Sequence, residues 1–311
     1  MIRMDVLIVG SLAYDSLETP AGSVENELGG SASYGGFSAA FHNNGDAGNG
    51  VGIVGVIGQD FQSEHMEWYE KAGLDISGIE VNQGETFRWK GSYHGSMAEA
   101  VTHETHLNVF ENFQPKVPQS LKKTKVLMCA NLHPALQASV LSQTEVSRVS
   151  LLDSMNLWIE IANQELKDVM KQVDILILND GEVRMLAGEE NLIVAAKAVL
   201  EMKNGGILVV KKGENGVIAF HPEGMISMPS FPTSNLVDPT GCGDSFAGSI
   251  AHYLSKNSGE VSREELAESL VHATVTASFT IESFGTERIR KLSADEYESR
   301  LLEYRSITKT S

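Results

Sequence analysis

Short runs of β-branched and aliphatic residues recur along the chain, separated by stretches with helical spacing. Most of these runs are continuous rather than alternating, which is typical of strands that are covered on both faces. The alternation of strand and helix predicts a mostly parallel sheet joined by right-handed crossovers. The expected strands are 6–9, 51–57, 125–130, 150–152, 173–178 and 207–210, and apolar stripes at 136–141, 158–166 and 193–202 predict helices between them.

The segment 86–109 has a different period, of two residues. In its first half the aromatic residues Phe87, Trp89 and Tyr93 all stand at odd-numbered positions, with polar residues between them. The second half again alternates apolar and polar residues. The pattern predicts an antiparallel hairpin that turns near 95–98. Because a hairpin with one apolar face is not stable alone in water, we expect that face to cover a ligand cleft or to pack on the same hairpin of a second subunit.

The last third of the chain has helical patterns over 241–255, 263–281 and 294–304. No repeat, low-complexity tract or long linker is visible. The 311 residues include 42% apolar and 21% charged side chains, an ordinary globular composition. We therefore expect a single α/β domain over 1–311 that carries the hairpin as a small extra module.

The charge balance narrows the possible partners. With 24 Lys and Arg against 41 Asp and Glu, the net charge is −17, which disfavours nucleic acid and anionic membranes as partners. Cys129 and Cys242 are too few for a disulfide framework or a four-ligand zinc site, so we expect a cytoplasmic protein. No apolar run approaches the roughly 18 residues of a membrane span, and 6–13 is better explained as a buried strand than as a signal peptide.

Candidate chemistry is concentrated in 236–249. There Pro239 and three glycines mark a loop that opens a helix, and such a turn presents unpaired backbone N–H groups to an anion. A carboxylate in that cradle would weaken anion binding. We therefore expect Asp244 to accept a proton from a hydroxyl that attacks phosphorus, with helix capping as the simpler alternative.

The segment 238–246, Asp-Pro-Thr-Gly-Cys-Gly-Asp-Ser-Phe, resembles the carboxy-terminal signature of the ribokinase-like (PfkB) carbohydrate kinases. Four further segments resemble family motifs in the same order: 10–15, which ends in Asp15; the Gly-Gly motif at 29–34; Asn-x-x-Glu at 179–182; and the nucleotide-side loop at 212–216. The resemblance implies a ribokinase-like three-layer α/β/α domain with a Rossmann-like sheet and a small β-lid formed by about 12–28 and 84–110.

The resemblance also implies an activity, the transfer of the γ-phosphoryl group of ATP to a sugar or nucleoside hydroxyl, with Mg²⁺ and a monovalent cation such as K⁺. Asp244 would be the general base. The other implied roles are an anion hole at Gly241, Cys242 and Gly243; acceptor binding by Asp15, Gly29, Gly30, Ser31 and Tyr34; nucleotide binding by Asn179, Lys212, Gly213 and Gly216; magnesium organised through water by Glu182; and a monovalent cation held by Asp238.

The chain departs from the family pattern at three positions. Pro239 replaces Thr and Cys242 replaces Ala, which leaves the backbone donors in place. Tyr34 stands where many sugar kinases have Asn, so it fills volume and offers one hydroxyl in place of an amide. The segment 153–156 resembles the family's Asp-x-Asn motif but has one extra residue, and no role is assigned to Asp153 or Asn156.

Four other signals favour ordinary structure over chemistry. The glycines of 52–58 lack the spacing of a dinucleotide fingerprint and indicate a packed strand followed by a turn. His103 and His106 would point to opposite faces of a strand, and Cys129 fits an inert core position. The pair 211–212 is too short for a basic patch and would offset acidic charge locally near a nucleotide.

Three functions remain open. A carbohydrate kinase leads slightly over a nucleoside kinase, since the lid aromatics Phe87 and Trp89 and the bulky Tyr34 would suit either acceptor. A catalytically silent regulator that binds nucleotide or sugar is the alternative of another class, and the intact Asp244 and Glu182 argue against it. We further expect a homodimer that forms through the lid.

Overall fold

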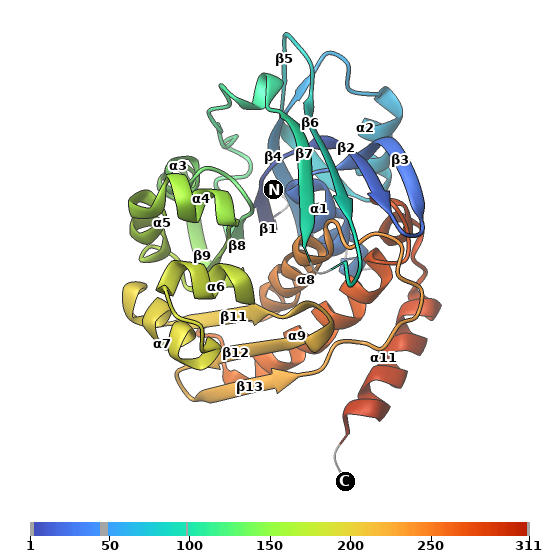
Figure 1. Cartoon of the computed structure of the whole chain (residues 1–311). Coiled ribbons are helices and arrows are strands. Elements are labelled where there is room, and N and C mark those ends of the chain that lie inside the picture. The colour runs from blue at the N-terminus through green and yellow to red at the C-terminus, as the bar shows by residue number, and fades with distance from the viewer. Residues whose placement is uncertain (1–2, 44–48, 98, 310–311) are drawn as a thin grey trace.

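The computed structural model describes residues 3–43, 49–97 and 99–309. Its centre is a large sheet (Figure 1). Within the described residues this sheet has nine strands: β1 (Arg3–Val9), β4 (Asn49–Gly58), β5 (Leu74–Asn82), β8 (Lys123–Cys129), β9 (Glu145–Asp153), β10 (Ile175–Asn179), β11 (Ile207–Lys211), β12 (Val217–His221) and β13 (Gly224–Met228). Their order is β13-β12-β11-β10-β9-β8-β1-β4-β5, with parallel pairing from β11 to β5 and antiparallel pairing of β12 and β13. The predicted strands are confirmed.

Helices cover both faces of the large sheet, which gives three layers. Alternate strand residues such as Ile8 and Leu7 belong to separate apolar clusters on the two faces. One face packs against α1 (Ser31–His42), α2 (Ser63–Lys71), α8 (Cys242–Ser255), α9 (Arg263–Thr280), α10 (Glu287–Lys291) and α11 (Ala294–Thr308). The other packs against α3 (Pro134–Gln143), α4 (Asn156–Ile161), α5 (Asn163–Met170), α6 (Asp180–Ala187) and α7 (Leu192–Met202).

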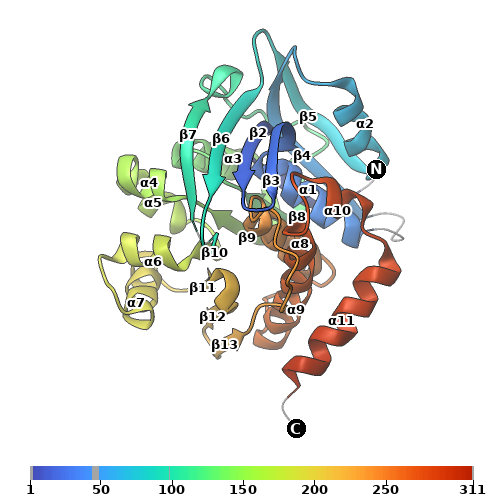
Figure 2. The same ribbon diagram turned by 45° about the vertical axis from the view of Figure 1, so that its right-hand side comes forward.

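A second, smaller sheet stands above α1 and α8 in Figures 1 and 2. It consists of β2 (Ala13–Thr19), β3 (Gly22–Gly29), β6 (Phe87–Tyr93) and β7 (Ala100–His106), in the order β3-β2-β6-β7. β6 and β7 pair antiparallel, which confirms the hairpin, whereas β2 and β6 run parallel. Its turn includes a bond from the Met97 N–H to the His94 carbonyl (3.0 Å); Ala98, the end of the predicted turn, lies outside the described residues.

The apolar face of the hairpin is covered only in part. Trp89 and Tyr93 of β6 pack with Leu17 of β2 and with Phe284, which follows α9. Every residue of β7 is exposed, including Val101 at 49%. The hairpin therefore leaves β7 as an open edge strand with unpaired backbone groups.

The single helix predicted from the stripe at 158–166 is wrong. Ala162 adopts φ −136° and ψ 37°, which ends α4 and starts α5 one residue later. Ile161, expected in the buried stripe, is 65% exposed, while Leu166 is buried. The two short helices each pack their own apolar residues on the sheet, and periodicity alone could not locate the break.

Glycines bring α1 and α8 into direct contact. A Cβ on Gly248 would lie 2.2 Å from the Gly35 carbonyl oxygen, so only glycine fits at this crossing. The close approach places the Gly-Gly motif that precedes α1 beside the signature loop that precedes α8. Two segments more than 200 residues apart in the sequence thus come together at one end of the sheet.

Candidate active site

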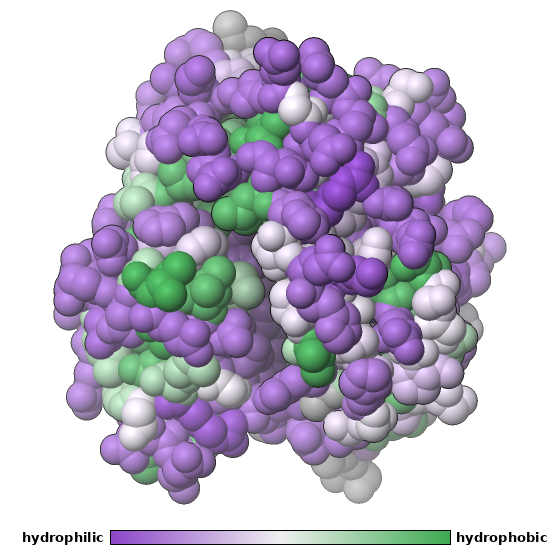
Figure 3. Space-filling model, turned by 45° about the horizontal axis from the view of Figure 1, so that its top comes forward, coloured by the Kyte–Doolittle hydropathy of each residue, from purple (hydrophilic) through white to green (hydrophobic). Residues whose placement is uncertain are grey.

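The parallel strands end together at one edge of the large sheet. β9 ends at Asp153, β10 at Asn179 and β11 at Lys211, and Asn179 and Lys211 are direct partners in the register. Open α/β sheets bind their ligands outside this edge. Viewed with the top of the molecule brought forward, the surface is mostly hydrophilic and hollowed near its centre (Figure 3).

The signature loop presents free backbone donors at the start of α8. Gly241 has φ 73°, a left-handed conformation that suits glycine, and α8 begins at the next residue. The N–H groups of Gly241 and Gly243 have no backbone or side-chain acceptor among the described residues. The N–H of Cys242, which the resemblance places in the same anion hole, instead donates to the Pro239 carbonyl at 3.2 Å. An anion at this position would therefore be bound mainly by the N–H groups of Gly241 and Gly243 and by the dipole of α8.

Asp244 lies half-buried in the first turn of α8. Burial raises the pKa of its carboxyl group above the usual range, and the charge of Asp153 raises it further, against the effects of Lys211 and of its own N–H group. A raised pKa makes the carboxylate a stronger base. Asp244 thus combines a position beside free N–H groups with the acid–base properties that proton transfer needs.

Asp15 lies inside β2, six residues beyond the end of β1, and is 4% exposed. Its carboxylate rests on Gly29: a Cβ there would lie 1.9 Å from Asp15 Oδ2. Burial, followed by the charges of Asp238 and Asp244, raises the pKa of Asp15 to about 8. Acidic residues predicted from two separate motifs, 10–15 and 238–246, therefore form one group of side chains.

Three other residues predicted to bind the acceptor make contacts within the protein itself. Gly30 has φ 95°, and a Cβ there would lie 2.5 Å from the Ser11 carbonyl oxygen. The Ser31 hydroxyl accepts the Ser11 N–H at 3.1 Å. Tyr34 is 1% exposed and packs against Gly241, and its buried hydroxyl has no hydrogen-bond partner among the described residues.

Asp238 is fully buried behind the signature loop. Its carboxylate accepts the N–H groups of Thr240 (2.9 Å) and Gly285 (3.4 Å), and burial raises its pKa. In the part of the chain that the structure describes, no Lys, Arg or His forms an ion pair with it. A buried carboxylate without a cationic partner fits a small monovalent cation.

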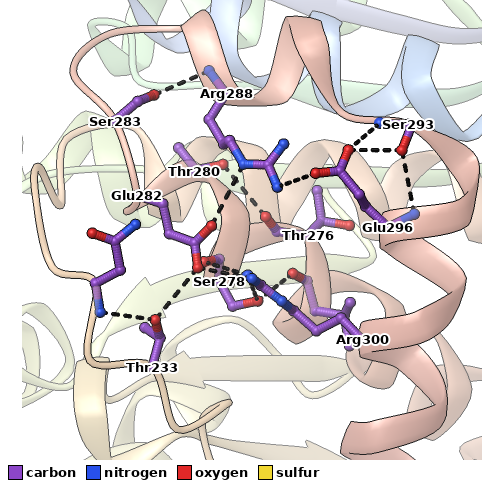
Figure 4. Close-up of polar contacts among 12 residues, drawn as sticks. Thr233, Thr276, Ser278, Thr280, Glu282, Ser283, Arg288, Ser293, Glu296 and Arg300 are labelled. Atoms are coloured by element: carbon purple, nitrogen blue, oxygen red, sulfur yellow. Dashed lines mark hydrogen bonds and ion pairs between the residues drawn. The ribbon is translucent and has the colours of Figure 1, made fainter.

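The loop that supplies the Gly285 contact is fixed by a polar network around Glu282 (Figure 4). Glu282 pairs with Arg300 of α11 at 2.8 Å and with Arg288 of α10 at 3.5 Å. Phe284 of the same loop packs under the small sheet. One short loop therefore links Asp238, the C-terminal helices and the hairpin.

Asn179 and Glu182 form a capping box at the start of α6. The Asn179 side chain accepts the Glu182 N–H at 2.8 Å, and Glu182 accepts the Asn179 N–H at 2.7 Å. Glu182 is 7% exposed, and burial raises its pKa. One Glu182 oxygen is thus occupied by the bond to the Asn179 N–H. The carboxylate still adds negative charge at the edge where the parallel strands end.

Lys211 and Asp153 form a buried ion pair that was not predicted from the sequence. Lys211 Nζ lies 2.9 and 3.1 Å from the two Asp153 oxygens, and a Cβ on Gly243 would lie 2.9 Å from Nζ. Both residues end strands that the sequence predicted. Their positions at strand ends could have predicted the pair, because polar residues at the carboxyl ends of parallel strands meet at one edge of the sheet.

The nucleotide-side loop lies next to this pair. The Lys212 N–H donates to the Gly216 carbonyl at 2.8 Å around a short 3₁₀ turn (Gly213–Asn215). Gly213 is exposed. Gly216 has φ 79°, and a Cβ there would lie 2.1 Å from the Met228 carbonyl oxygen, so this turn requires glycine.

The signals set aside in the sequence lie outside this site. Segment 52–58 is within β4, as predicted, and Cys129 ends β8 in the core, where burial raises its pKa to about 12. On the exposed strand β7, His103 bonds Ser92 and His106 pairs with Glu104.

Comparison with known proteins agrees with this geometry. The sequence profile described as pfkB family carbohydrate kinase matches residues 5–291. The chain belongs to this family. It is 29% identical over 252 residues to a cytidine kinase from Thermococcus kodakarensis, a match that covers 79% of this chain and 86% of the relative.

Two solved structures share the fold over nearly the whole chain. The nucleoside kinase of Methanocaldococcus jannaschii has a TM-score of 0.75 at 18% identity, covering 97% of this chain and 99% of its own. The ribokinase of Thermotoga maritima has a TM-score of 0.74 at 19% identity, covering 96% and 99%. These matches confirm the ribokinase-like α/β fold.

Membership of the family establishes the class of activity. The protein is an ATP-dependent kinase that phosphorylates a hydroxyl of a sugar or of a sugar-containing molecule. This confirms the activity predicted from the sequence and leaves the silent regulator without support. None of the helices in the described parts of the chain is long and apolar enough to cross a membrane.

Proposed function

We propose that this kinase phosphorylates the ribose of a nucleoside, with Asp244 as the general base. The observation that carries the proposal is the arrangement of Asp15 and Asp244 around the free N–H groups at the start of α8. An acceptor hydroxyl bound between these carboxylates would face a phosphoryl group held by Gly241 and Gly243. Asp244 would take the hydroxyl proton as the oxygen attacks phosphorus.

The choice of a nucleoside is supported by the cytidine kinase, which matches most of the chain. The sequence slightly favoured a simple sugar. A sugar remains the second candidate, because the matched family is described as carbohydrate kinases. Trp89 of the small sheet, which is partly exposed, would suit a planar base, since aromatic rings stack readily on one another.

The acidic residues at the strand-end edge fit a magnesium ion held through water. Asp153, Glu182 and Asp244 face a single lysine, Lys211, which leaves an excess of negative charge. We propose that the ion keeps several waters and contacts these carboxylates through them. Bound there with ATP, Mg²⁺ would neutralise the charge of the β- and γ-phosphates.

A monovalent cation at Asp238 is supported by the buried carboxylate, which has no cationic partner among the described residues. The Ile281 carbonyl accepts the N–H groups of Val237 and Asp238, at 2.9 and 3.1 Å, and so holds the signature loop against the turn after α9. K⁺ is the ion we propose. Its role would be to offset the charge of Asp238 and keep the anion hole in place.

The small sheet would act as the lid over the acceptor and as the dimer contact. Tyr93 of β6 accepts a hydrogen bond from Thr240 of the signature loop at 3.3 Å, so the sheet already reaches the site. The exposed edge strand β7 offers its backbone groups and Val101 to a second copy. The use of ATP and the two free cysteines support a cytoplasmic location.

The test is a coupled assay of ADP release with Mg²⁺, K⁺ and single acceptors: cytidine, uridine, adenosine, inosine, ribose, deoxyribose and fructose. We expect a nucleoside to give the highest kcat/KM, and the Asp244→Asn variant to give none of this signal above about 1%. A sugar used more efficiently than every nucleoside would replace the first candidate with the second. Absence of acceptor-dependent ADP release with the whole panel would count against both.

A further inference from the structure

Lys211 places an ammonium group beside the proposed anion hole. It is the last residue of β11, and its Nζ lies so close to Gly243 that a Cβ there would be 2.9 Å away. A phosphoryl oxygen bound to the Gly243 N–H would therefore be within reach of this cation. The side chain is 19% exposed, so the ammonium is buried but not sealed from the site.

The ion pair with Asp153 does not fully account for this lysine. Asp153 accepts two hydrogen bonds from Nζ, at 2.9 and 3.1 Å, and an ammonium has three protons. No other described residue takes the third proton. The pair sets the direction of the side chain and leaves one donor for a ligand.

The surrounding charges also indicate that the ammonium serves more than one partner. The carboxylates of Asp153, Glu182 and Asp244 all act on Lys211, which makes it the shared cation of the cluster. Neutralising Asp153 alone would not require the ammonium group to lie next to the backbone of Gly243. A cation held in advance near developing negative charge stabilises a transition state without reorganisation.

We infer that Lys211 is a catalytic residue that binds an oxygen of the transferred phosphoryl group, while Asp153 positions it; this inference rests on the proposed kinase function. In the reaction the acceptor oxygen forms a bond to the γ-phosphorus, and the bond from that phosphorus to the β-phosphate oxygen breaks. The hydroxyl proton passes to Asp244, and ADP leaves. Lys211 keeps its proton throughout and contributes only charge and a hydrogen bond.

The primary test compares Lys211→Met and Lys211→Gln with the wild type. We expect kcat to fall by about 10²–10³, as for removal of one preorganised transition-state donor, and KM for ATP to change by less than about fivefold. A second readout is calorimetric binding of ADP and Mg²⁺ with and without aluminium fluoride, which mimics the transferred phosphoryl group. The wild type should bind ADP more tightly with aluminium fluoride, and both variants should lose this gain while keeping their affinity for ADP alone.

Lys203→Met is the matched control. Lys203 is a second buried lysine, just before the opposite end of β11, and its Nζ donates to the Val173 and Gly205 carbonyls at 2.6 and 3.2 Å. Its removal should lower the melting temperature and leave kcat unchanged. Equal losses of kcat in Lys203→Met and Lys211→Met would assign both effects to stability and overturn the inference.

The double variant Asp153→Asn/Lys211→Met separates catalysis from simple pairing. If Lys211 only compensates the charge of Asp153, removing both charges restores kcat, and the inference is wrong. If Lys211 acts on the phosphoryl group, the double variant stays slow. A wild type that phosphorylates no acceptor and gains no affinity from aluminium fluoride would overturn the proposed function itself, whereas an active wild type beside fully active Lys211 variants would overturn this inference alone.

Discussion

The ring of Tyr34 lies against Gly241, where a Cβ would come within 2.4 Å of three of its ring carbons. Gly241 also has φ 73°, so a side chain would be strained both by its backbone and by the ring. The Gly-Gly motif thus supports the proposed anion hole through Tyr34, the aromatic residue that distinguishes this chain from many sugar kinases.

Gly241→Ala should therefore destabilise the protein and abolish most activity. Gly188→Ala is the control, because Gly188 has φ 68° with open space around it and reports the backbone penalty alone, about 1–2 kcal/mol. Urea unfolding should show a clearly larger loss for Gly241→Ala. Equal losses for the two variants would contradict the tight contact with Tyr34.

Asp244→Asn should lower kcat by about 10²–10⁴, which is the usual contribution of a positioned base. The amide keeps the size of the side chain, so folding and ATP binding should be preserved. Steady-state kinetics together with calorimetric titration of ATP provide the measurement. A variant that retains more than half of the wild-type kcat would show that Asp244 is not the base.

Asp15→Asn should stabilise the protein at pH 8. The pKa of Asp15 is about 8 in the folded protein against 3.8 for an unperturbed side chain, so the folded state binds the extra proton between these values. Stability is then lost as the pH rises through this window, by about 1.4 kcal/mol per pH unit at most. Urea unfolding at pH 6 and pH 8 should show a smaller difference for the variant, and an unchanged difference would speak against burial of the charge.

The same variant should lose acceptor binding. Removing a charged hydrogen bond to a substrate hydroxyl typically costs about 1.5–3 kcal/mol, or 10–150-fold in kcat/KM for the acceptor. KM for ATP should stay nearly constant. One substitution should thus raise stability and lower activity. This trade-off is typical of functional sites, and here its cause is the close placement of like charges.

A histidine cluster formed by α1, α8 and α9 should make the protein sensitive to acid. His252 lines a cavity of about 210 Å³ with His42, His272 and Lys256, and both nitrogens of its buried ring lack partners among the described residues. Burial lowers the pKa of His252 to about 3. Its contribution to stability is complete above the unfolded pKa near 6.5 and is lost as the pH falls toward 3.

His252→Phe should accordingly reduce the slope of unfolding free energy against pH between 6.5 and 4.5. The exposed His103 on β7 provides the matched control, and His103→Phe should leave the slope unchanged. The two slopes can be compared in urea titrations at four or five pH values. A His252 variant as acid-sensitive as the wild type would assign the acid sensitivity to other groups.

Val101→Asp should weaken the dimer proposed to form through β7. Val101 is 49% exposed on the edge strand, so the charge is tolerated by the monomer and disfavoured in a strand-to-strand contact. Leu302→Asp on α11, at a residue 68% exposed, tests a second apolar position away from the small sheet. In sedimentation velocity only Val101→Asp should shift toward monomer, and a monomeric wild type at tens of micromolar would end the dimer proposal.

The large sheet could be predicted because its strands are buried on both faces and therefore form continuous apolar runs. The signature loop could be predicted because its glycines and Asp244 are neighbours in the sequence. The pair of Lys211 and Asp153 was not, since it depends on the register across β9, β10 and β11. The N–H of Cys242 was assigned to the anion hole from the motif, and only the turn geometry shows its bond to Pro239.

The contact between Asp15 and Gly29 restricts how this enzyme can evolve. Any side chain at position 29 would occupy the space of the Asp15 carboxylate, so a single mutation there would displace that carboxylate and with it the proposed acceptor contact. A lineage that changed its acceptor would need coordinated changes at both positions. The exposed residues of β7 have no such restriction, so substitutions there can accumulate one at a time without displacing a buried side chain.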